Sequence, residues 1–371
     1  MVTARQLVES PAKLSPARPG DRAMENGVKN ADSGFQKWPL ASRMGRCRRG
    51  KNGGTVWRFT KAAALIVVAT VGINASGEDK AAAVDSGSDL LWKKAESRID
   101  EIAVRFDGVM GVAIVDLSDA RPALLRNAEH VFPAASSIKL AILLELYHQD
   151  EQARAGVKGK ATLDDLYTFD PKDLVEDSRV MGGLSAGVTR VTNRDLAQFM
   201  VAVSDNTAAN VLIDRVGKDN VNAMLRGLGL AKTMLRRKMM DVAAAQRGDE
   251  NVATPHEMVQ LLEAIYKGKV LKADSTRELI KQLSTLKPSY IPRELPDGVQ
   301  VANKPGELEG VRTDSGIVFS ANRPFAISVM TAYASDDRAA ERAISDVARE
   351  AYHYFEMRSK TSEYGRILPA P

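Results

Sequence analysis

The strand-forming segments of this chain fall into two groups that lie far apart in the sequence. Two early and three late segments are rich in apolar, β-branched residues and are separated by Gly, Asn or Pro: residues 109–117, 120–127, 298–304, 312–320 and 324–333. The sequence between the two groups has mainly helical spacing. One sheet built from both ends of the chain, with a helical region inserted, accounts for this order, so we predict an α+β fold.

Helix signals mark the limits of these parts. Residues 90–106 and 337–358 are amphipathic and lie outside the strand groups. In the middle, Thr254 is a capping residue, Pro255 takes the first helical position and Gly268 ends the same helix. We place an α/β part at about 90–148 and 270–358, and a helical lobe at about 149–269.

The first 77 residues differ in charge from the rest. They carry 13 Lys or Arg and four Asp or Glu, whereas the remainder carries 39 basic and 43 acidic residues. Residues 1–60 are polar and rich in Gly and Pro, which predicts disorder. The excess of basic residues that gives the whole chain its net charge of +5 therefore lies in this segment. The folded part, residues 78–371, gives no general case for nucleic-acid binding.

An apolar run, Ala62–Ala75, follows basic residues and precedes Ser76 and Gly77. This order is typical of a secretory signal cleaved before Glu78, and the run is shorter than the roughly 20 residues that a membrane span needs. We predict an exported protein, periplasmic or secreted, with no stable membrane domain after signal removal. An uncleaved anchor and a buried core segment are the alternatives. The basic region is long for a signal, so Met44 is a candidate start.

The residue types that bind metals are scarce. Cys47 is the single cysteine, which excludes an intramolecular disulfide. The four histidines form no H-E-x-x-H or Cys/His pattern. We expect no metal and no cofactor. Nothing indicates an obligate assembly, so we expect a monomer.

Ser136 stands three residues before Lys139, where the turn-like run FPAAS becomes an apolar, helix-forming run. Serine commonly caps a helix by accepting a hydrogen bond from a free N–H group. Alternatively, Ser136 is a nucleophile, because residues at i and i+3 share a helix face and a buried lysine can act as a base. In that case the N–H of Ser136 is one oxyanion donor.

Ser204, Asp205 and Asn206 stand just before a predicted helix. Such residues are ordinary helix caps. The functional alternative has Ser204 relaying protons while the Asn206 amide binds a substrate carbonyl.

Lys304 and Gly306 lie on or beside a C-terminal strand. One interpretation is a solvated edge-strand lysine before a Pro-Gly turn. In the functional interpretation, Lys304 supplies a fixed positive charge and Gly306 lets the backbone approach a ligand closely. The N–H of Glu307 is then the second oxyanion donor, opposite that of Ser136.

The motifs S-x-x-K, S-D-N and K-x-G, in this order, are the signature set of serine β-lactamases and penicillin-binding proteins. Over Leu91–Phe355 the sequence resembles a class A β-lactamase, in the segments FPAASSIK, TNRDLAQFMVAVSDNTAANVLI and NKPGELEGVRTDSGIV. The resemblance implies an antiparallel sheet with helices on its faces, an all-helical lobe and a cleft between them. It also implies the roles of the motif residues: Ser136 as acylated nucleophile, Lys139 as its proton partner, Ser204 as proton shuttle to the leaving nitrogen, Asn206 as amide ligand and Lys304 as carboxylate ligand.

Pro305 departs from the family pattern, which has a hydroxyl residue here that helps to hold the substrate carboxylate. Proline offers neither a hydroxyl nor an N–H. Arg312, Thr313 and Ser315 are candidates to compensate. We take Arg312 as a substrate-binding residue, although an exposed strand arginine is an equally good interpretation.

The deacylating glutamate of class A enzymes is the second departure. It stands in an E-x-x-L-N setting in a loop after S-D-N. The corresponding region here, residues 235–258, contains no such motif. Asp241 is our candidate base, and Asp249 and Glu250 are the other nearby acidic residues. A surface or cap position is the alternative for each of them.

We therefore predict a serine β-lactamase that opens the amide of β-lactam rings. The alternative is a D-Ala-D-Ala-type peptidase or penicillin-binding protein that is acylated but releases its acyl group slowly. Residues 183–187 match G-x-S-x-G but lack the strand before and helix after that a nucleophile elbow needs. A ligand-binding module without catalysis is the third rival, and the presence of every motif residue argues against it.

Overall fold

The computed structural model describes residues 87–118, 123–320 and 323–369. The predicted disorder of residues 1–60 and the signal-like run Ala62–Ala75 lie outside these ranges. Within them, no helix is both long and apolar enough to cross a membrane.

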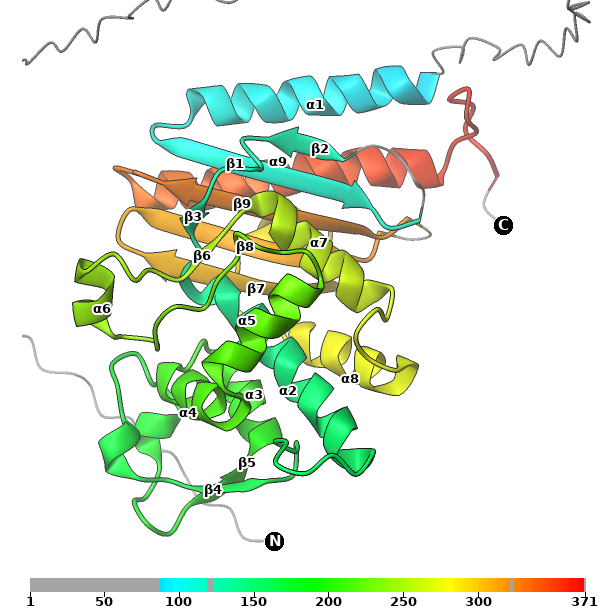
Figure 1. Cartoon of the computed structure of the whole chain (residues 1–371). Coiled ribbons are helices and arrows are strands. Elements are labelled where there is room, and N and C mark those ends of the chain that lie inside the picture. The colour runs from blue at the N-terminus through cyan, green and yellow to red at the C-terminus, as the bar shows by residue number, and fades with distance from the viewer. Residues whose placement is uncertain (1–86, 119–122, 321–322, 370–371) are drawn as a thin grey trace, which may run out of the picture. The chain divides into compact units, whose positions relative to one another are not determined.

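The main sheet unites strands from both ends of the chain, which confirms the predicted fold class (Figure 1). The early strands are β1 (Val109–Asp116) and β2 (Leu124–Arg126), and the late strands are β7 (Val301–Leu308), β8 (Val311–Val318) and β9 (Phe325–Ala332). Their order is β2-β1-β9-β8-β7, and all neighbours are antiparallel. The strand β7, which carries the K-P-G triplet, is therefore an edge strand.

Helices cover both faces of the sheet, so its inner strands are buried almost along their whole length. On one face lie α1 (Gly87–Arg105) and α9 (Asp337–Ser359) (Figure 1). Phe325 of β9 stacks there on Phe355 of α9, with ring centroids 4.3 Å apart. The other face packs on α7 (Pro255–Tyr266), whose N-terminus is capped by Thr254 as predicted.

The lobe next to the sheet is mainly helical, and its helices are α2 (Lys139–Arg154), α3 (Asn193–Ala202), α4 (Asn206–Val216), α5 (Lys218–Gly227) and α6 (Val242–Gln246). A further helix, α8 (Ala273–Leu283), was not predicted. Short 3-10 turns are η1 (Ala135–Ile138), η2 (Pro171–Asp173), η3 (Met181–Gly183) and η4 (Ile291–Glu294).

The lobe is not entirely helical, which corrects one detail of the expected architecture. Within the lobe, strand β4 (Leu166–Thr168) pairs with β5 (Arg190–Thr192). A second short pair joins β3 (Phe132–Pro133), which belongs to the α/β part, to β6 (Val252–Ala253). Strands of two or three residues are too short for a period of two to be recognised in the sequence.

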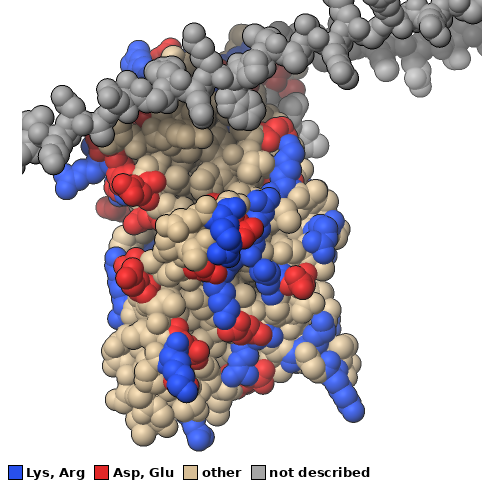
Figure 2. All heavy atoms as spheres, turned by 60° about the vertical axis from the view of Figure 1, so that its left-hand side comes forward, with Lys and Arg blue, Asp and Glu red and all other residues tan. Residues whose placement is uncertain are grey.

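Positive and negative side chains alternate over the face of the molecule drawn in Figure 2. This mixture agrees with the near balance of charge in residues 78–371, which gives no general case for nucleic-acid binding.

Candidate active site

Ser136 lies in the 3-10 turn η1, and the long helix α2 begins only at Lys139. Ala134 and Ile138 are the cap residues of these two elements, and neither end has a side-chain cap hydrogen bond. The capping interpretation of Ser136 is therefore wrong. The turn begins at Ala135, whose φ of 47° is uncommon for a residue other than glycine. Backbone strain of this kind often occurs at functional sites.

The strand β7 lies directly against the backbone of the serine turn. A Cβ atom on Gly306 would lie 2.7 Å from the backbone nitrogen of Ser136 and 2.6 Å from Thr313 Oγ1. Ser137 Oγ donates to the carbonyl of Lys304 (3.1 Å) and lies 2.6 Å from Thr313 Oγ1. Only glycine fits at position 306, and its close approach brings the serine next to the edge strand.

Lys139 points from the first turn of α2 into the S-D-N segment. Its Nζ donates to the Ser204 carbonyl (2.7 Å), to Ser204 Oγ (3.1 Å) and to Asn206 Oδ1 (2.8 Å). The side chain is fully buried. The structure thus brings together residues 65 positions apart, as the motif pattern requires.

Lys304 reaches the same hydroxyl from β7. Its Nζ donates to Ser204 Oγ (3.0 Å) and to the carbonyl of Pro305 (2.8 Å). Ser204 itself has a φ of 58°, in the left-handed region. This conformation presents the Ser204 carbonyl to Lys139 and its hydroxyl to both lysines. Because Lys304 is buried as well as bonded, its interpretation as a solvated edge-strand lysine is wrong.

Burial controls the charge of both lysines. It lowers the pKa of Lys139 well below the usual lysine value, and the neighbouring Lys304 lowers it further, against the effect of Asp205 and Asp177. Burial also lowers the pKa of Lys304 to about 7. A buried lysine whose pKa is lowered in this way can accept a proton from a serine, so Lys139 is equipped to act as a base.

The two residues after Ser204 have different roles: Asp205 is a helix cap, and Asn206 is a polar partner of Lys139. Asp205 caps α4 by accepting from Ala208 N, and it also accepts from the backbone of residues 180 and 181. Asn206 bonds Lys139 through Oδ1, and its Nδ2 donates to the carbonyl of Glu176 (3.2 Å). The amide of Asn206 therefore connects the lysine to the loop at residues 175–181.

Pro305 does not interrupt β7, which runs without a break from Val301 to Leu308. Proline is tolerated in an edge strand where its nitrogen faces away from the neighbouring strand. Backbone nitrogens alternate between the two edges of a strand, so that of Glu307 points the same way as that of Pro305.

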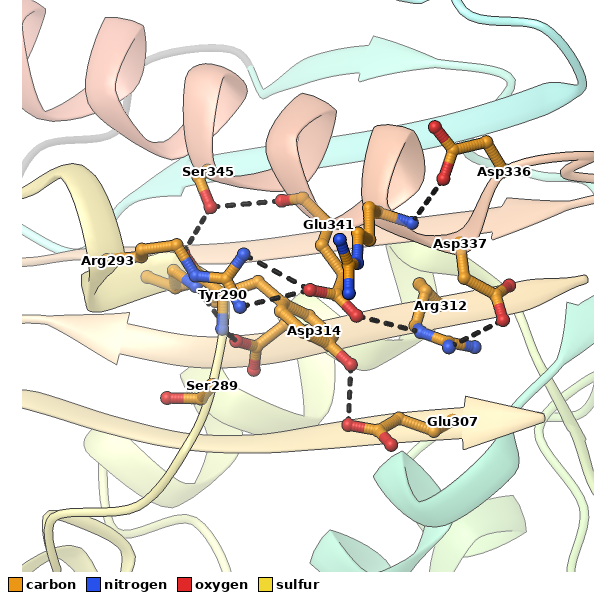
Figure 3. A network of polar contacts seen from close by, with 12 residues as sticks. Ser289, Tyr290, Arg293, Glu307, Arg312, Asp314, Asp336, Asp337, Glu341 and Ser345 are labelled. Carbon is orange, nitrogen blue, oxygen red and sulfur yellow. Dashed lines mark hydrogen bonds and ion pairs between the residues drawn. The ribbon is translucent and has the colours of Figure 1, made fainter. Parts of the chain in front are cut away.

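The structure does not bring Arg312 to the Ser204 cluster, which differs from our prediction. Arg312 lies on the sheet face covered by α9, where its guanidinium pairs with Asp337 (2.7 Å) and Glu341 (3.4 Å) (Figure 3). On the same face, the Glu307 side chain accepts from Tyr290 Oη (2.6 Å). Arg312 and Glu307 share this face because they are register partners on adjacent strands.

The acidic candidates of the loop at residues 235–258 are engaged elsewhere. Asp241 is the N-cap of α6 and accepts from Ala244 N. Glu250 pairs with Arg237 at 2.7 Å, and Asp249 lies 3.8 Å from Arg247. The cap position explains Asp241 without a catalytic role, which differs from our prediction that it is the base.

Sequence reasoning missed the contact that holds this loop on the lobe. Asn210 Oδ1 accepts from Met239 N (2.7 Å), and its Nδ2 donates to Met239 O (3.1 Å). Asn210 follows Asn206 by one turn of α4. Position 239 is therefore fixed close to the ligands of Lys139, and its buried side chain is apolar. The sequence offers no local signal for this pairing.

Two further possibilities can be assessed from the described residues. No group of three or more His, Cys, Asp or Glu in that part of the chain is arranged to hold a metal ion. Residues 183–187 begin at the last residue of η3 and continue as a turn, with no strand before them, so a nucleophile elbow is excluded there.

A family model described as the β-lactamase enzyme family matches residues 94–355. The chain belongs to this family. The assignment confirms the resemblance that the three sequence motifs indicated.

Individual members of the β-lactamase family are similar at low identity. Beta-lactamase 1 of Streptomyces cacaoi is 27% identical over 255 residues, which is 64% of this chain and 76% of that protein. The structure of PBP-A has a TM-score of 0.63 at 25% identity and covers 71% of this chain and 96% of its own. The β-lactamase of Sphaerobacter thermophilus has a TM-score of 0.62 at 27% identity, over 70% of this chain and 96% of its own.

Proposed function

We propose that the protein is a serine acyl-transfer enzyme whose Ser136 is acylated by β-lactams, or by cell-wall peptides of similar shape, and that it hydrolyses the acyl-enzyme slowly. The observation that supports acylation most directly is the Ser204 hydroxyl held between two buried lysines, Lys139 and Lys304. Family membership supports the same reaction class.

In the proposed reaction, Ser136 Oγ bonds to the carbonyl carbon of the substrate amide while neutral Lys139 takes its proton. The carbonyl oxygen becomes an oxyanion. When the tetrahedral intermediate collapses, the C–N bond breaks and the leaving nitrogen receives a proton through Ser204. Lys304, when charged, attracts the substrate carboxylate. No metal or organic cofactor takes part in this scheme.

Two backbone N–H groups are proposed as oxyanion donors, those of Ser136 and Glu307. The close approach of Gly306 to Ser136 supports their pairing. The proline at 305 supports the orientation of the second donor, because a nitrogen that faces the open edge at 305 implies one at 307. No hydroxyl at 305 is needed for this arrangement.

Slow hydrolysis is proposed from the residue at position 239. Deacylation needs a base that activates water. Asn210 fixes this part of the loop one helical turn from Asn206, but the side chain there is that of Met239, which accepts no proton. The three loop carboxylates have other partners. One of the similar solved structures, a variant of PBP-A at 25% identity, is an acyl-enzyme complex with penicillin G.

The test mixes the protein with a chromogenic cephalosporin and follows absorbance and intact mass together. We expect a stoichiometric burst and a persistent adduct that is absent from Ser136→Ala. Steady turnover without an adduct would mean an efficient β-lactamase and would overturn the proposal that the acyl-enzyme is hydrolysed slowly. Neither turnover nor adduct would overturn acylation by β-lactams. Release of D-Ala from a D-Ala-D-Ala peptide, measured in parallel, decides between peptidase and simple penicillin binding.

We also propose that the protein is exported, from the signal-like run Ala62–Ala75. Cell fractionation and the N-terminal sequence of the mature chain test this proposal. Recovery of the intact chain in the cytoplasm would contradict it.

A further inference from the structure

A buried polar group lies beneath the K-P-G triplet and has no role in the mechanism described so far. It consists of Lys287, Asn303 and Asp314. Asp314 is fully buried and Asn303 almost so. The position of Asp314 below Tyr290 is seen in Figure 3. Charged side chains are rarely buried in this way unless they are paired.

Burial raises the pKa of Asp314, and its hydrogen bonds oppose this effect by favouring the carboxylate form. Its two oxygens accept from Asn303 Nδ2 at 2.9 and 3.0 Å, and one of them also accepts from the backbone nitrogens of Tyr290 and Ile291, each at 2.9 Å. Every partner is an N–H donor. A protonated oxygen would have to face such a donor with its own hydrogen, so these contacts favour the ionised form.

Three acceptors surround the Lys287 ammonium group or amine. Its Nζ donates to the carbonyls of Leu283 (2.6 Å) and Thr285 (2.7 Å) and to Asn303 Oδ1 (3.3 Å). The amide of Asn303 thus bridges the two charges, with its oxygen on Lys287 and its nitrogen on Asp314. Burial lowers the pKa of Lys287 to about 8, and Asp314 opposes this effect.

This group is next to Lys304 on two sides. Asn303 precedes it in the chain, and Asp314 is the register partner of Pro305, which follows it. Asp314 raises the pKa of Lys304 and Lys287 lowers it, with burial as the largest effect and Glu307 as a further raising group. Lys139, on α2, is the other titratable side chain that meets Lys304 at Ser204.

We propose that Asp314 and Lys287, joined through Asn303, are positioning residues that fix the strand carrying Lys304. They also act on the charge of Lys304 in opposite directions: Asp314 favours its charged form, and Lys287 disfavours it. The proposal deepens the proposed function, because a charged Lys304 is what attracts the substrate carboxylate. Neither residue needs to touch the substrate.

The test titrates the lysines directly, without a substrate. The full chain is labelled with ¹³C at lysine Cε, and the resonances that move between about pH 6 and pH 9 are followed by NMR. Lys304→Gln identifies the Lys304 signal. Asp314→Asn and Lys287→Met are compared with Lys281→Met, a matched control on the exposed side of α8.

We expect the Lys304 midpoint to move down in Asp314→Asn and up in Lys287→Met, each by about one pH unit, because each variant removes a charge that acts on Lys304. The control should not move it. Because a charged Lys304 favours acylation, the alkaline limb of the acylation rate should shift with the same signs. A loss of thermal stability alone, with the Lys304 midpoint unchanged, would reduce the group to a structural role and overturn the proposal. The proposal would also be overturned if the Lys304 midpoint moved in the same direction in Asp314→Asn and Lys287→Met.

The two proposals fail in different ways. If wild-type protein gave no adduct with a β-lactam, the proposed function would fall, while the NMR titration would still decide the role of Asp314 and Lys287. If Ser136 were acylated but Lys304 titrated at the same pH in Asp314→Asn and Lys287→Met, only the proposed role of Asp314 and Lys287 would be overturned.

Discussion

Lys139 and Lys304 donate to one and the same hydroxyl, that of Ser204, at 3.1 and 3.0 Å. A hydroxyl oxygen has two lone pairs, so two N–H donors fill both of them. The Ser204 hydrogen is then free to point toward a third group, such as a substrate nitrogen. The closeness of the two lysines also explains why Lys304 lowers the pKa of Lys139, in addition to the larger effect of burial.

Replacement of Lys139 by arginine tests its role as a base. Arginine offers N–H donors like lysine but stays positively charged and does not lose its proton in proteins, so it cannot take one from Ser136. We expect Lys139→Arg to lower the acylation rate about 100-fold or more. Intact mass against time measures this rate, and circular dichroism checks the fold. An acylation rate close to that of wild type would exclude Lys139 as the base.

The stability of the protein should depend on pH through Lys304. Its pKa is about 7 in the folded protein, against an ordinary lysine value of 10.5. Between these values the unfolded chain binds more protons, so the free energy of unfolding should rise with pH across this window. Below pH 7 the full cost of burying the charge is present. We therefore expect Lys304→Met to raise the melting temperature most at about pH 6 and little near pH 10. Lys281→Met, an exposed lysine, should show no such trend.

A carboxylate at position 239 should accelerate release of the acyl group. Asn210 binds only backbone atoms of Met239, so the loop can keep its position when the side chain changes. A glutamate there would be largely buried, which raises its pKa and favours a base that works near neutral pH. We expect Met239→Glu to shorten the lifetime of the adduct at least about tenfold.

The matched comparison for this loop is Asp241→Ala. It should leave the adduct lifetime unchanged and cost about 1 kcal/mol of stability, because Asp241 caps α6. A longer lifetime in Asp241→Ala would return Asp241 to the role of base.

Gly306→Ala should damage the site by sterics alone. The added methyl group would meet the nitrogen of Ser136 at 2.7 Å, and a backbone atom cannot move aside like the end of a flexible side chain. We expect a destabilisation of about 1–3 kcal/mol and a marked loss of acylation. Gly183→Ala is the control, since nothing lies within 4 Å of a Cβ placed there. Equal behaviour of the two variants would contradict the close contact.

The fold and the cluster formed by Lys139, Ser204, Asn206 and Lys304 could be predicted because their sequence signals are local. The late strands are eight-residue segments separated by turn residues, and the S-x-x-K, S-D-N and K-x-G motifs are each only a few residues long. Whether Ser136 capped a helix could not be decided locally, because the answer depended on a single 3-10 turn before α2.

The errors have a common physical cause, which is that strand register and loop contacts are tertiary properties. Arg312 looked available until its register with Glu307 placed it toward the carboxylates of α9. Asp241 looked like a base until its bond to Ala244 N identified it as a cap. The pairing of Asn210 with Met239 joins residues 29 positions apart with no motif around either.

The location of the K-P-G triplet on an edge strand has a consequence for how the protein behaves at high concentration. An open strand edge is a template on which another chain can add a strand, and long edges of this kind promote aggregation. In the proposed reaction a substrate has to reach the edge of β7 beside Ser136, so no other part of the chain can cover it there. Pro305 removes one outward-facing donor from the middle of β7. The residue that departs from the family pattern thus leaves room for a small ligand while making the same edge a poor template for amyloid-like growth.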